Sequence, residues 1–167
     1  MLAQNVAFWI VAVVMAVAAL GVVRTKNVVH AALFLVVVLA GAAAQYILIA
    51  AEFVAWVQVL IYIGAVIILF LFGIMLTRAP MQAQGDLDND QRGPAAIVAL
   101  GLLAVLIVLL VDAFGAKEIR LTGDLLEVGR TGAVGDSIFR QFVVPFEVVS
   151  MLLLAALVGA VAIARRD

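Results

Sequence analysis

The chain has 167 residues, of which 68% are hydrophobic and 13% are charged, and its mean hydropathy is +1.30. Soluble domains are roughly 45–50% apolar, so this composition predicts an integral membrane protein. The absence of cysteine and the single histidine, His30, exclude iron–sulfur clusters, a paired-histidine haem and zinc sites of the usual kind within this chain. Because the net charge is only −1 and the charges are scattered, we also predict no nucleic-acid partner.

The first two apolar runs predict membrane-spanning helices at about residues 6–23 and 28–50. A secretory signal peptide is the competing interpretation of the first run, but the start MLAQN lacks the basic segment with which such peptides begin. Asn27 follows a basic turn and is predicted to cap the second helix. Small residues from Ala40 to Ala44 allow close backbone approach in lipid, so we expect the second helix to pack inside a bundle.

The third apolar run, at about residues 53–76, is less uniform than an ordinary span. A single crossing takes roughly 20 residues, so the chain must break before this run, and Ala50-Ala51-Glu52 offers the only polar position. Polar groups in lipid are costly unless they face protein or water, which makes each of them a candidate functional residue. The candidates at this span are Glu52, Gln58, Tyr62 and Gly64.

The remaining sequence predicts two more spans and two polar connectors. The spans lie at about residues 95–114 and 144–164, and the connectors at 77–94 and 115–143. The alternating aspartates Asp86, Asp88 and Asp90 suggest a calcium loop, but Gln91 and Ile97 stand where that loop requires glycine and glutamate. We therefore predict no metal site in this chain. The connector 115–143 carries several turn-forming glycines and is interpreted as a loop.

Two features of the last span have structural interpretations. Ala155 and Gly159 have the small-xxx-small spacing of a close helix contact. Glu147 is expected in the first turn, where a carboxylate interacts favourably with the helix dipole. Together the spans predict an all-α, polytopic membrane protein with five transmembrane helices in a single membrane domain over residues 1–167. Six of the ten basic residues fall on the side of the carboxyl terminus, which favours an external amino terminus and a cytoplasmic carboxyl terminus.

The polar residues of the third span each have a structural and a functional interpretation. Glu52 is either an interfacial turn residue or a carboxylate that exchanges protons near neutral pH, and the sequence favours neither. Gln58 and Tyr62 lie four residues apart on nearly one face, and hydrogen bonding between helices is the commoner use of such a pair. Gly64 permits either close packing or a distortion such as a π-bulge, and π-bulges concentrate at functional sites.

Two segments carry a family resemblance. VQVLIYIGAVIILFLFGIML and PFEVVSMLLLAALVGAVAIA resemble the third and fifth transmembrane helices of subunit J of bacterial NADH:quinone oxidoreductase, respiratory complex I. The likeness extends to the length, the spacing of five spans, the polar connector after the third and the glycine-rich loop before PFE. It implies a non-redox membrane-arm subunit in the bacterial inner membrane, with no cofactor or catalytic centre of its own. FMN, iron–sulfur clusters and quinone are then expected on partner subunits.

The resemblance also implies neighbours and a mechanism. The expected neighbours are the quinone-junction subunit, the small glutamate-bearing subunit, the antiporter-like subunits and membrane lipids. In this family the third helix undergoes an α-to-π transition that opens or closes a water-linked proton path, and Tyr62 and Gly64 would mark it here. Glu52 would match an acidic residue near the start of that helix. Two alternatives stay open: a structural scaffold without a proton role, and the equivalent subunit of a related sodium–proton antiporter or membrane-bound hydrogenase.

Overall fold

The computed structural model describes residues 2–77, 91–115 and 123–165. These ranges contain helices and turns but no strand, and five helices are long and apolar enough to cross a membrane. The prediction of an all-α, five-span membrane protein is confirmed. The first, second, fourth and fifth spans are α1 (Leu2–Arg24), α2 (Val28–Leu48), α5 (Arg92–Phe114) and α8 (Val143–Ala164). The third is assembled from α3 (Glu52–Val57), η1 (Gln58–Ile67) and α4 (Ile68–Leu76).

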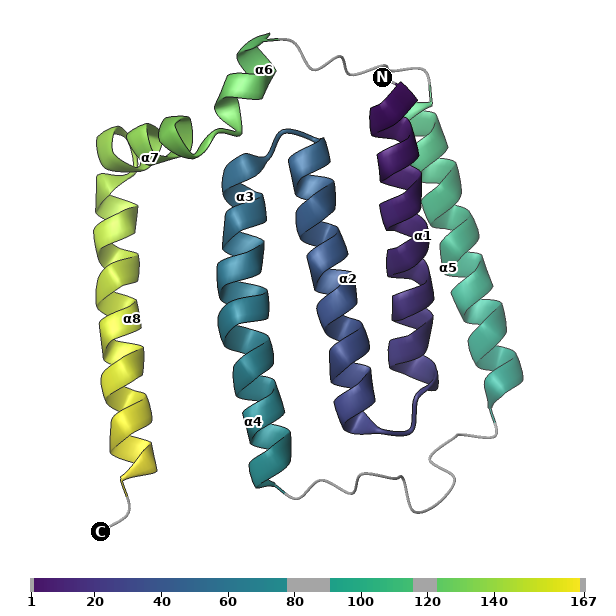
Figure 1. Ribbon diagram of the computed structural model, residues 1–167, viewed down its shortest axis with the longest axis horizontal. Coiled ribbons are helices and arrows are strands. Elements are labelled where there is room, and N and C mark those ends of the chain that lie inside the picture. The colour runs from purple at the N-terminus through teal and green to yellow at the C-terminus, as the bar shows by residue number, and fades with distance from the viewer. Residues whose placement is uncertain (1, 78–90, 116–122, 166–167) are drawn as a thin grey trace.

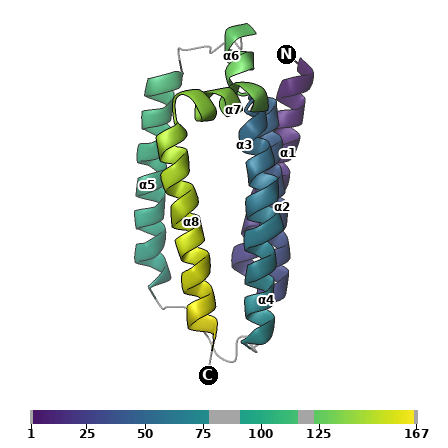
Figure 2. The same cartoon turned by 90° about the vertical axis from the view of Figure 1, so that its left-hand side faces the viewer.

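The spans form two layers that meet at one end (Figures 1 and 2). α1, α2 and the third span lie side by side, with α2 in the middle, while α5 and α8 stand off on the other side. The amino terminus, the α2–α3 turn and the short helices α6 (Gly123–Val128) and α7 (Thr131–Arg140) share one end, and the carboxyl terminus lies at the opposite end. α7 lies across the ends of the spans and connects to α8.

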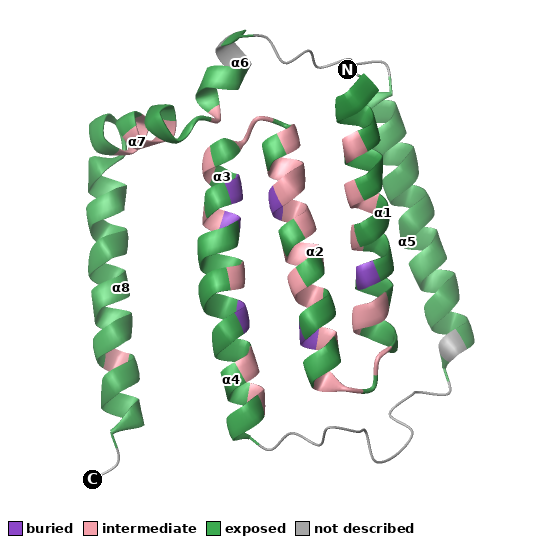
Figure 3. Cartoon of the chain, viewed as in Figure 1, coloured by how far each residue is buried: buried purple, intermediate pink, exposed green. Residues whose placement is uncertain are grey.

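The first layer is packed through small residues, as the run from Ala40 to Ala44 predicts. The buried apolar residues are mostly alanines, namely Ala18, Ala32, Ala43 and Ala55, together with Ile67. At Gly21 an added Cβ would lie 2.9 Å from ring atoms of Phe34, which shows how closely α1 approaches α2. In lipid such contacts stabilise helix pairs because lipid chains supply no competing hydrophobic force. Figure 3 shows that the buried residues of this layer face one another.

The turn between α2 and α3 falls at the predicted break. The Ala50 N–H donates to the Ile47 carbonyl (3.0 Å) and the Ala51 N–H to the Tyr46 carbonyl (2.9 Å), which is the hydrogen-bond pattern of a Schellman motif. Ala50 occupies the left-handed position of that motif with a φ of 61°, where glycine is the usual residue. At the start of α2, the Asn27 side chain accepts hydrogen bonds from the Val29 and His30 N–H groups, so the predicted cap is confirmed.

The connector 115–143 was predicted to be a loop, and this is wrong for its described part. α6 and α7 occupy residues 123–128 and 131–140, despite glycines at 132 and 135. Val134 and Ile138 are half-buried on one face of α7, and Asp136 pairs with Arg140 at a distance of 2.6 Å on the exposed side. The apolar face of this helix is partly covered at the level of the span ends, and this partial burial offsets the low helix propensity of glycine.

Several predicted boundaries move by one to four residues. α1 begins at Leu2, α5 begins at Arg92 and α8 begins at Val143. Pro94 lies in the first turn of α5, where its missing N–H costs little, so the proline marks a helix start and not the connector. The earlier start of α8 places Glu147 beyond the first turn, so the predicted dipole interaction of this carboxylate is wrong. The three aspartates at 86, 88 and 90 lie outside the described residues.

Candidate functional site

The third span changes its hydrogen-bonding register in the middle. Residues Gln58–Ile67 form a π-helix of 10 residues between the α-helical segments α3 and α4. A π-helix pairs each N–H with the carbonyl five residues earlier, and most natural examples are single-turn bulges at functional sites. Backbone dihedrals on both sides remain in the right-handed helical region, so the span continues without a break. The segment begins at Gln58 and contains Tyr62 and Gly64, where the resemblance led us to expect a π-bulge.

Gln58 and Tyr62 differ in their surroundings. Gln58 is buried at 9% exposure, whereas Tyr62 keeps 48% of its surface exposed. Within the described residues Gln58 is therefore packed against this chain, whereas Tyr62 is left open to lipid or to a partner. Neither side chain makes a hydrogen bond to another residue in the part of the chain that the structure describes. Hydrogen bonding between helices of this chain, the structural interpretation of the pair, has no support in that part.

Gly64 is not needed for close packing in this conformation. A Cβ added there would meet only the Val59 carbonyl oxygen, at an ordinary distance of 3.5 Å. The π-helical state itself would therefore accept alanine at this position. Of the two interpretations of Gly64, close packing has no partner here, and the residue lies inside the distortion. Packing in this register therefore does not require the missing side chain of Gly64.

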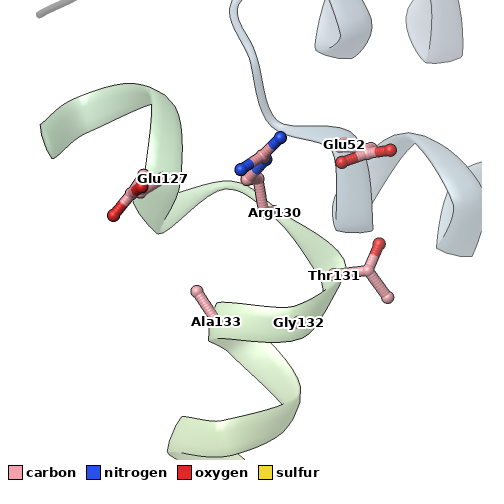
Figure 4. Close-up of a pocket in the computed structure, with 6 residues that line it drawn as sticks. All are labelled: Glu52, Glu127, Arg130, Thr131, Gly132 and Ala133. Carbon is pink, nitrogen blue, oxygen red and sulfur yellow. The ribbon is translucent and has the colours of Figure 1, made fainter. Parts of the chain in front are cut away.

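Glu52 lies apart from these residues, at the membrane-surface end of the span. It is exposed in the first turn of α3 and lines two adjoining cavities with Glu127 and Arg130, of about 440 Å³ and 500 Å³. Figure 4 shows the Arg130 side chain between the carboxylates of Glu127 and Glu52, with Thr131 beside Glu52. Within the described residues, Arg130 forms no ion pair with either carboxylate. The structure thus brings Glu52 together with connector residues and not with Tyr62.

A backbone contact holds the connector against the third span. The Phe53 N–H donates to the Gly129 carbonyl at 3.1 Å. This bond satisfies one of the first N–H groups of α3, which have no partner within the helix, and Ala51 at the N-cap provides no side-chain hydrogen bond. A Cβ on Gly129 would lie 2.9 Å from the Ala50 carbonyl carbon and 3.1 Å from Ala51 Cα, so only glycine fits without displacement. Gly129 therefore fixes the α6–α7 turn on the α2–α3 turn.

The small residues of the last span pack against no other membrane-spanning helix among the described elements. Among the described elements, α8 contacts α7 only, and α5 contacts none of the other helices. A Cβ on Gly159 would meet nothing within 4 Å, and Ala155 is exposed. The predicted close contact at Ala155 and Gly159 stays a prediction for a partner outside this chain. No group of three or more histidine, aspartate or glutamate side chains in the described ranges is placed to hold a metal ion.

Sequence reasoning missed two kinds of residue. Glu127, Gly129 and Arg130 were assigned to a loop, although their charges and the glycine between them were visible; what the sequence does not reveal is that this turn folds onto Ala50. Gln45 was also missed. Its amide nitrogen donates to the Phe8 carbonyl of α1 at 3.2 Å, and its buried oxygen has no donor among the described residues.

The similarity to known proteins extends over almost the whole chain. Residues 18–163 match the family described as NADH-ubiquinone/plastoquinone oxidoreductase chain 6. The chain is 38% identical over 167 residues to the NAD(P)H-quinone oxidoreductase chain 6 of Leptolyngbya boryana, covering 98% of this chain and 81% of that protein. It is 36% identical over 167 residues to the F(420)H(2) dehydrogenase subunit J of Methanosarcina mazei, covering 98% and 92%. It is 35% identical over 163 residues to the NADH-quinone oxidoreductase subunit J of Rhodobacter capsulatus, covering 96% and 81%.

Proposed function

The chain belongs to the NADH-ubiquinone/plastoquinone oxidoreductase chain 6 family, and we propose that its third span gates proton movement in the enzyme complex that it helps to build. It is a membrane subunit of an NADH-quinone oxidoreductase and assembles with other subunits of that complex. The observation that supports gating is the π-helix of 10 residues, Gln58–Ile67, in the middle of an otherwise α-helical span. A change between π and α register moves one residue through the segment and turns the helix beyond it by roughly 100°.

Such a turn would change which side chains face a neighbouring subunit. Ile67 is buried against this chain, whereas Leu69 and Phe70 are exposed and would face a partner or lipid. Moving bulky apolar side chains into or out of a narrow gap is sufficient to exclude or admit water, and water carries protons. Quinone reduction elsewhere in the complex would favour one register through contacts that differ between the two states. In this proposal Gln58 and Tyr62 supply polar groups near the gap, and Glu52 lies at its outer end.

In this proposal the complex lies in the bacterial inner membrane, and this chain has its amino terminus outside and its carboxyl terminus in the cytoplasm. Partner subunits carry FMN, iron–sulfur clusters and quinone, and this chain carries no cofactor. Its neighbours are the quinone-junction subunit, the small glutamate-bearing subunit and the antiporter-like subunits. The Methanosarcina mazei relative is named as part of an F(420)H(2) dehydrogenase. An assay with NADH therefore also tests whether NADH is the electron donor of this complex.

The test compares two glycines of the same span. Gly64→Val is expected to lower the number of protons pumped per NADH oxidised, because a branched side chain restricts the backbone within the π segment. Gly73→Val is the matched control: Gly73 lies in α4, outside the segment, and a Cβ there would meet nothing within 4 Å. Tyr62→Phe removes only the hydroxyl group and tests the polar path. Pumping is measured in inverted vesicles against NADH:quinone electron transfer, and equal ratios in all variants would refute gating.

A scaffold role is the second candidate, favoured by the exposure of α5 and α8. Both spans are exposed along almost their whole length (Figure 3), so in the assembled enzyme lipid or other subunits cover them. Under this alternative, Gly159→Leu prevents assembly while Tyr62→Phe has no effect on pumping. Native gel electrophoresis of membranes distinguishes the two roles, because a gating variant assembles normally.

A further inference from the structure

We propose that the two adjoining cavities at the α2–α3 turn bind the headgroup of a zwitterionic phospholipid with a primary ammonium group, such as phosphatidylethanolamine. The cavities share Glu52, Glu127 and Arg130, and their volumes of about 440 Å³ and 500 Å³ fall in the range of small-molecule sites, roughly 300–1,000 Å³. This inference is independent of proton gating.

The charges of the site match both charges of such a headgroup. Arg130 presents a guanidinium that forms no ion pair with any described residue, and guanidinium groups bind phosphate through two parallel hydrogen bonds. Glu52 and Glu127 lie on either side of Arg130 (Figure 4) and accept hydrogen bonds only, so they suit an ammonium with three donors. Two carboxylates beside one guanidinium disfavour a purely anionic ligand.

The position and the apolar lining favour a lipid over a free phosphate compound. The cavities lie where α2 ends and α3 begins, at the level at which α7 crosses the ends of the spans, which is the headgroup layer for spans of this length. The second cavity adds Ile47, Ala50 and Leu126 to the shared charged residues, and 64% of Ile47 is exposed. A site with charges at one side and aliphatic side chains at the other fits an amphiphile.

The hydrogen bond between the Phe53 N–H and the Gly129 carbonyl gives the site a defined shape. Gly129 lies directly before Arg130, and its carbonyl accepts the Phe53 N–H of the helix that carries Glu52. The two walls of the cavity, α3 and the α6–α7 turn, are therefore joined by a hydrogen bond of 3.1 Å and by backbone contact with Ala50. Arg130 and Glu52 are held near each other without an ion pair between them.

The experiment uses the purified whole complex in vesicles that contain a trace of lipid with a diazirine in its acyl chain. Phosphatidylethanolamine, phosphatidylcholine and phosphatidylglycerol carrying the same diazirine are compared, and cross-linked peptides that contain Ile47 or Leu126 are quantified by mass spectrometry. We expect the ethanolamine lipid to label these peptides about two- to fivefold more than the other two, since exposed ion pairs contribute at most about 1 kcal/mol. Equal labelling by all three lipids in the wild-type complex would overturn the proposal without any variant.

Charge-removing variants test which residue binds which charged group of the lipid. Arg130→Gln is expected to reduce labelling by all three lipids, because each carries the phosphate, and Glu127→Gln to reduce labelling by the ethanolamine lipid most. Arg140→Gln is the matched control, because Arg140 lies on α7 and pairs with Asp136 outside the cavities. Equal effects of Arg130→Gln and Arg140→Gln would contradict the site. Loss of wild-type labelling upon addition of inorganic phosphate would identify a soluble anion as the ligand and would overturn the proposal. Cross-links from another subunit in place of lipid would show that protein fills the site and would overturn it as well.

Discussion

Replacing Gly129 by alanine tests whether the connector is fixed to the third span by its backbone. The new Cβ would lie 2.9 Å from the Ala50 carbonyl carbon, 3.1 Å from Ala51 Cα and closer still to the Ala50 carbonyl oxygen. Each of these atoms is backbone, so no side-chain rotation relieves the clash and the two turns must separate. Separation also removes the acceptor of the Phe53 N–H.

The cost follows from these two effects. An unrelieved steric clash in a packed site costs about 1–3 kcal/mol, and a lost hydrogen bond costs on the order of 1 kcal/mol. Together they destabilise the docked turn by about 2–4 kcal/mol, which lowers the docking equilibrium constant roughly 30- to 700-fold. Because the spans themselves are held elsewhere, the complex is expected to assemble, with the connector released from α3.

Hydrogen–deuterium exchange of the assembled complex measures this effect directly. Peptides covering residues 50–57 and 123–135 are expected to exchange faster in Gly129→Ala, while peptides from α1 are unchanged. Gly132→Ala is the control, because Gly132 lies three residues further on and a Cβ there meets nothing within 4 Å. Alanine should slightly favour helix at that position, by up to about 1 kcal/mol. Indistinguishable exchange in the two variants would refute the reasoning from backbone contact.

Two further substitutions probe the first layer. Ala50→Gly removes the strain of an alanine at a φ of 61° and should stabilise the α2–α3 turn by about 1 kcal/mol, visible as slower exchange of residues 46–53; no change or faster exchange would contradict the Schellman assignment. Gly21→Ala places a Cβ 2.9 Å from the Phe34 ring and should weaken the α1–α2 contact by about 1–3 kcal/mol, measured as a lower melting temperature of the complex. Gly101→Ala, in α5 with open space around it, is the control and should leave that temperature unchanged.

The spans were predictable because a bilayer requires each crossing helix to have a certain length and an apolar composition, and both can be read from the sequence. The break at Ala50 followed from the same arithmetic, since residues 28–76 exceed one crossing and only Glu52 offered a polar end. The cap at Asn27 was predictable from one residue type before an apolar run. These features depend on local sequence or on the solvent, and both can be evaluated without knowing which helices touch.

The connector and the π register depend on more than local sequence. Gly132 and Gly135 lower helix propensity, and only the apolar face of α7, once placed at the span ends, reverses that preference. The residues QVLIYIGAVI carry no pattern that separates pairing with the fourth preceding residue from pairing with the fifth. A π segment at Tyr62 and Gly64 was therefore expected from family resemblance alone, and residue-by-residue reasoning left Gly64 open between packing and distortion.

The position of the π segment limits how the proposed change of register can proceed. α3 is fixed at its start by the Gly129 carbonyl, and α-helical residues bracket the segment on both sides, so the altered register is not fraying of a helix end. A helix anchored at one end loses a π turn by passing the extra residue toward the other end, which rotates α4 against a stationary α3. The rotation would change the direction in which the exposed side chains of α4 point, which are Leu69, Phe70 and Phe72. Glu52, at the start of α3, would stay in place. A register change that moved residues 52–57 and left 68–76 unmoved would therefore contradict the anchor as well as the gate.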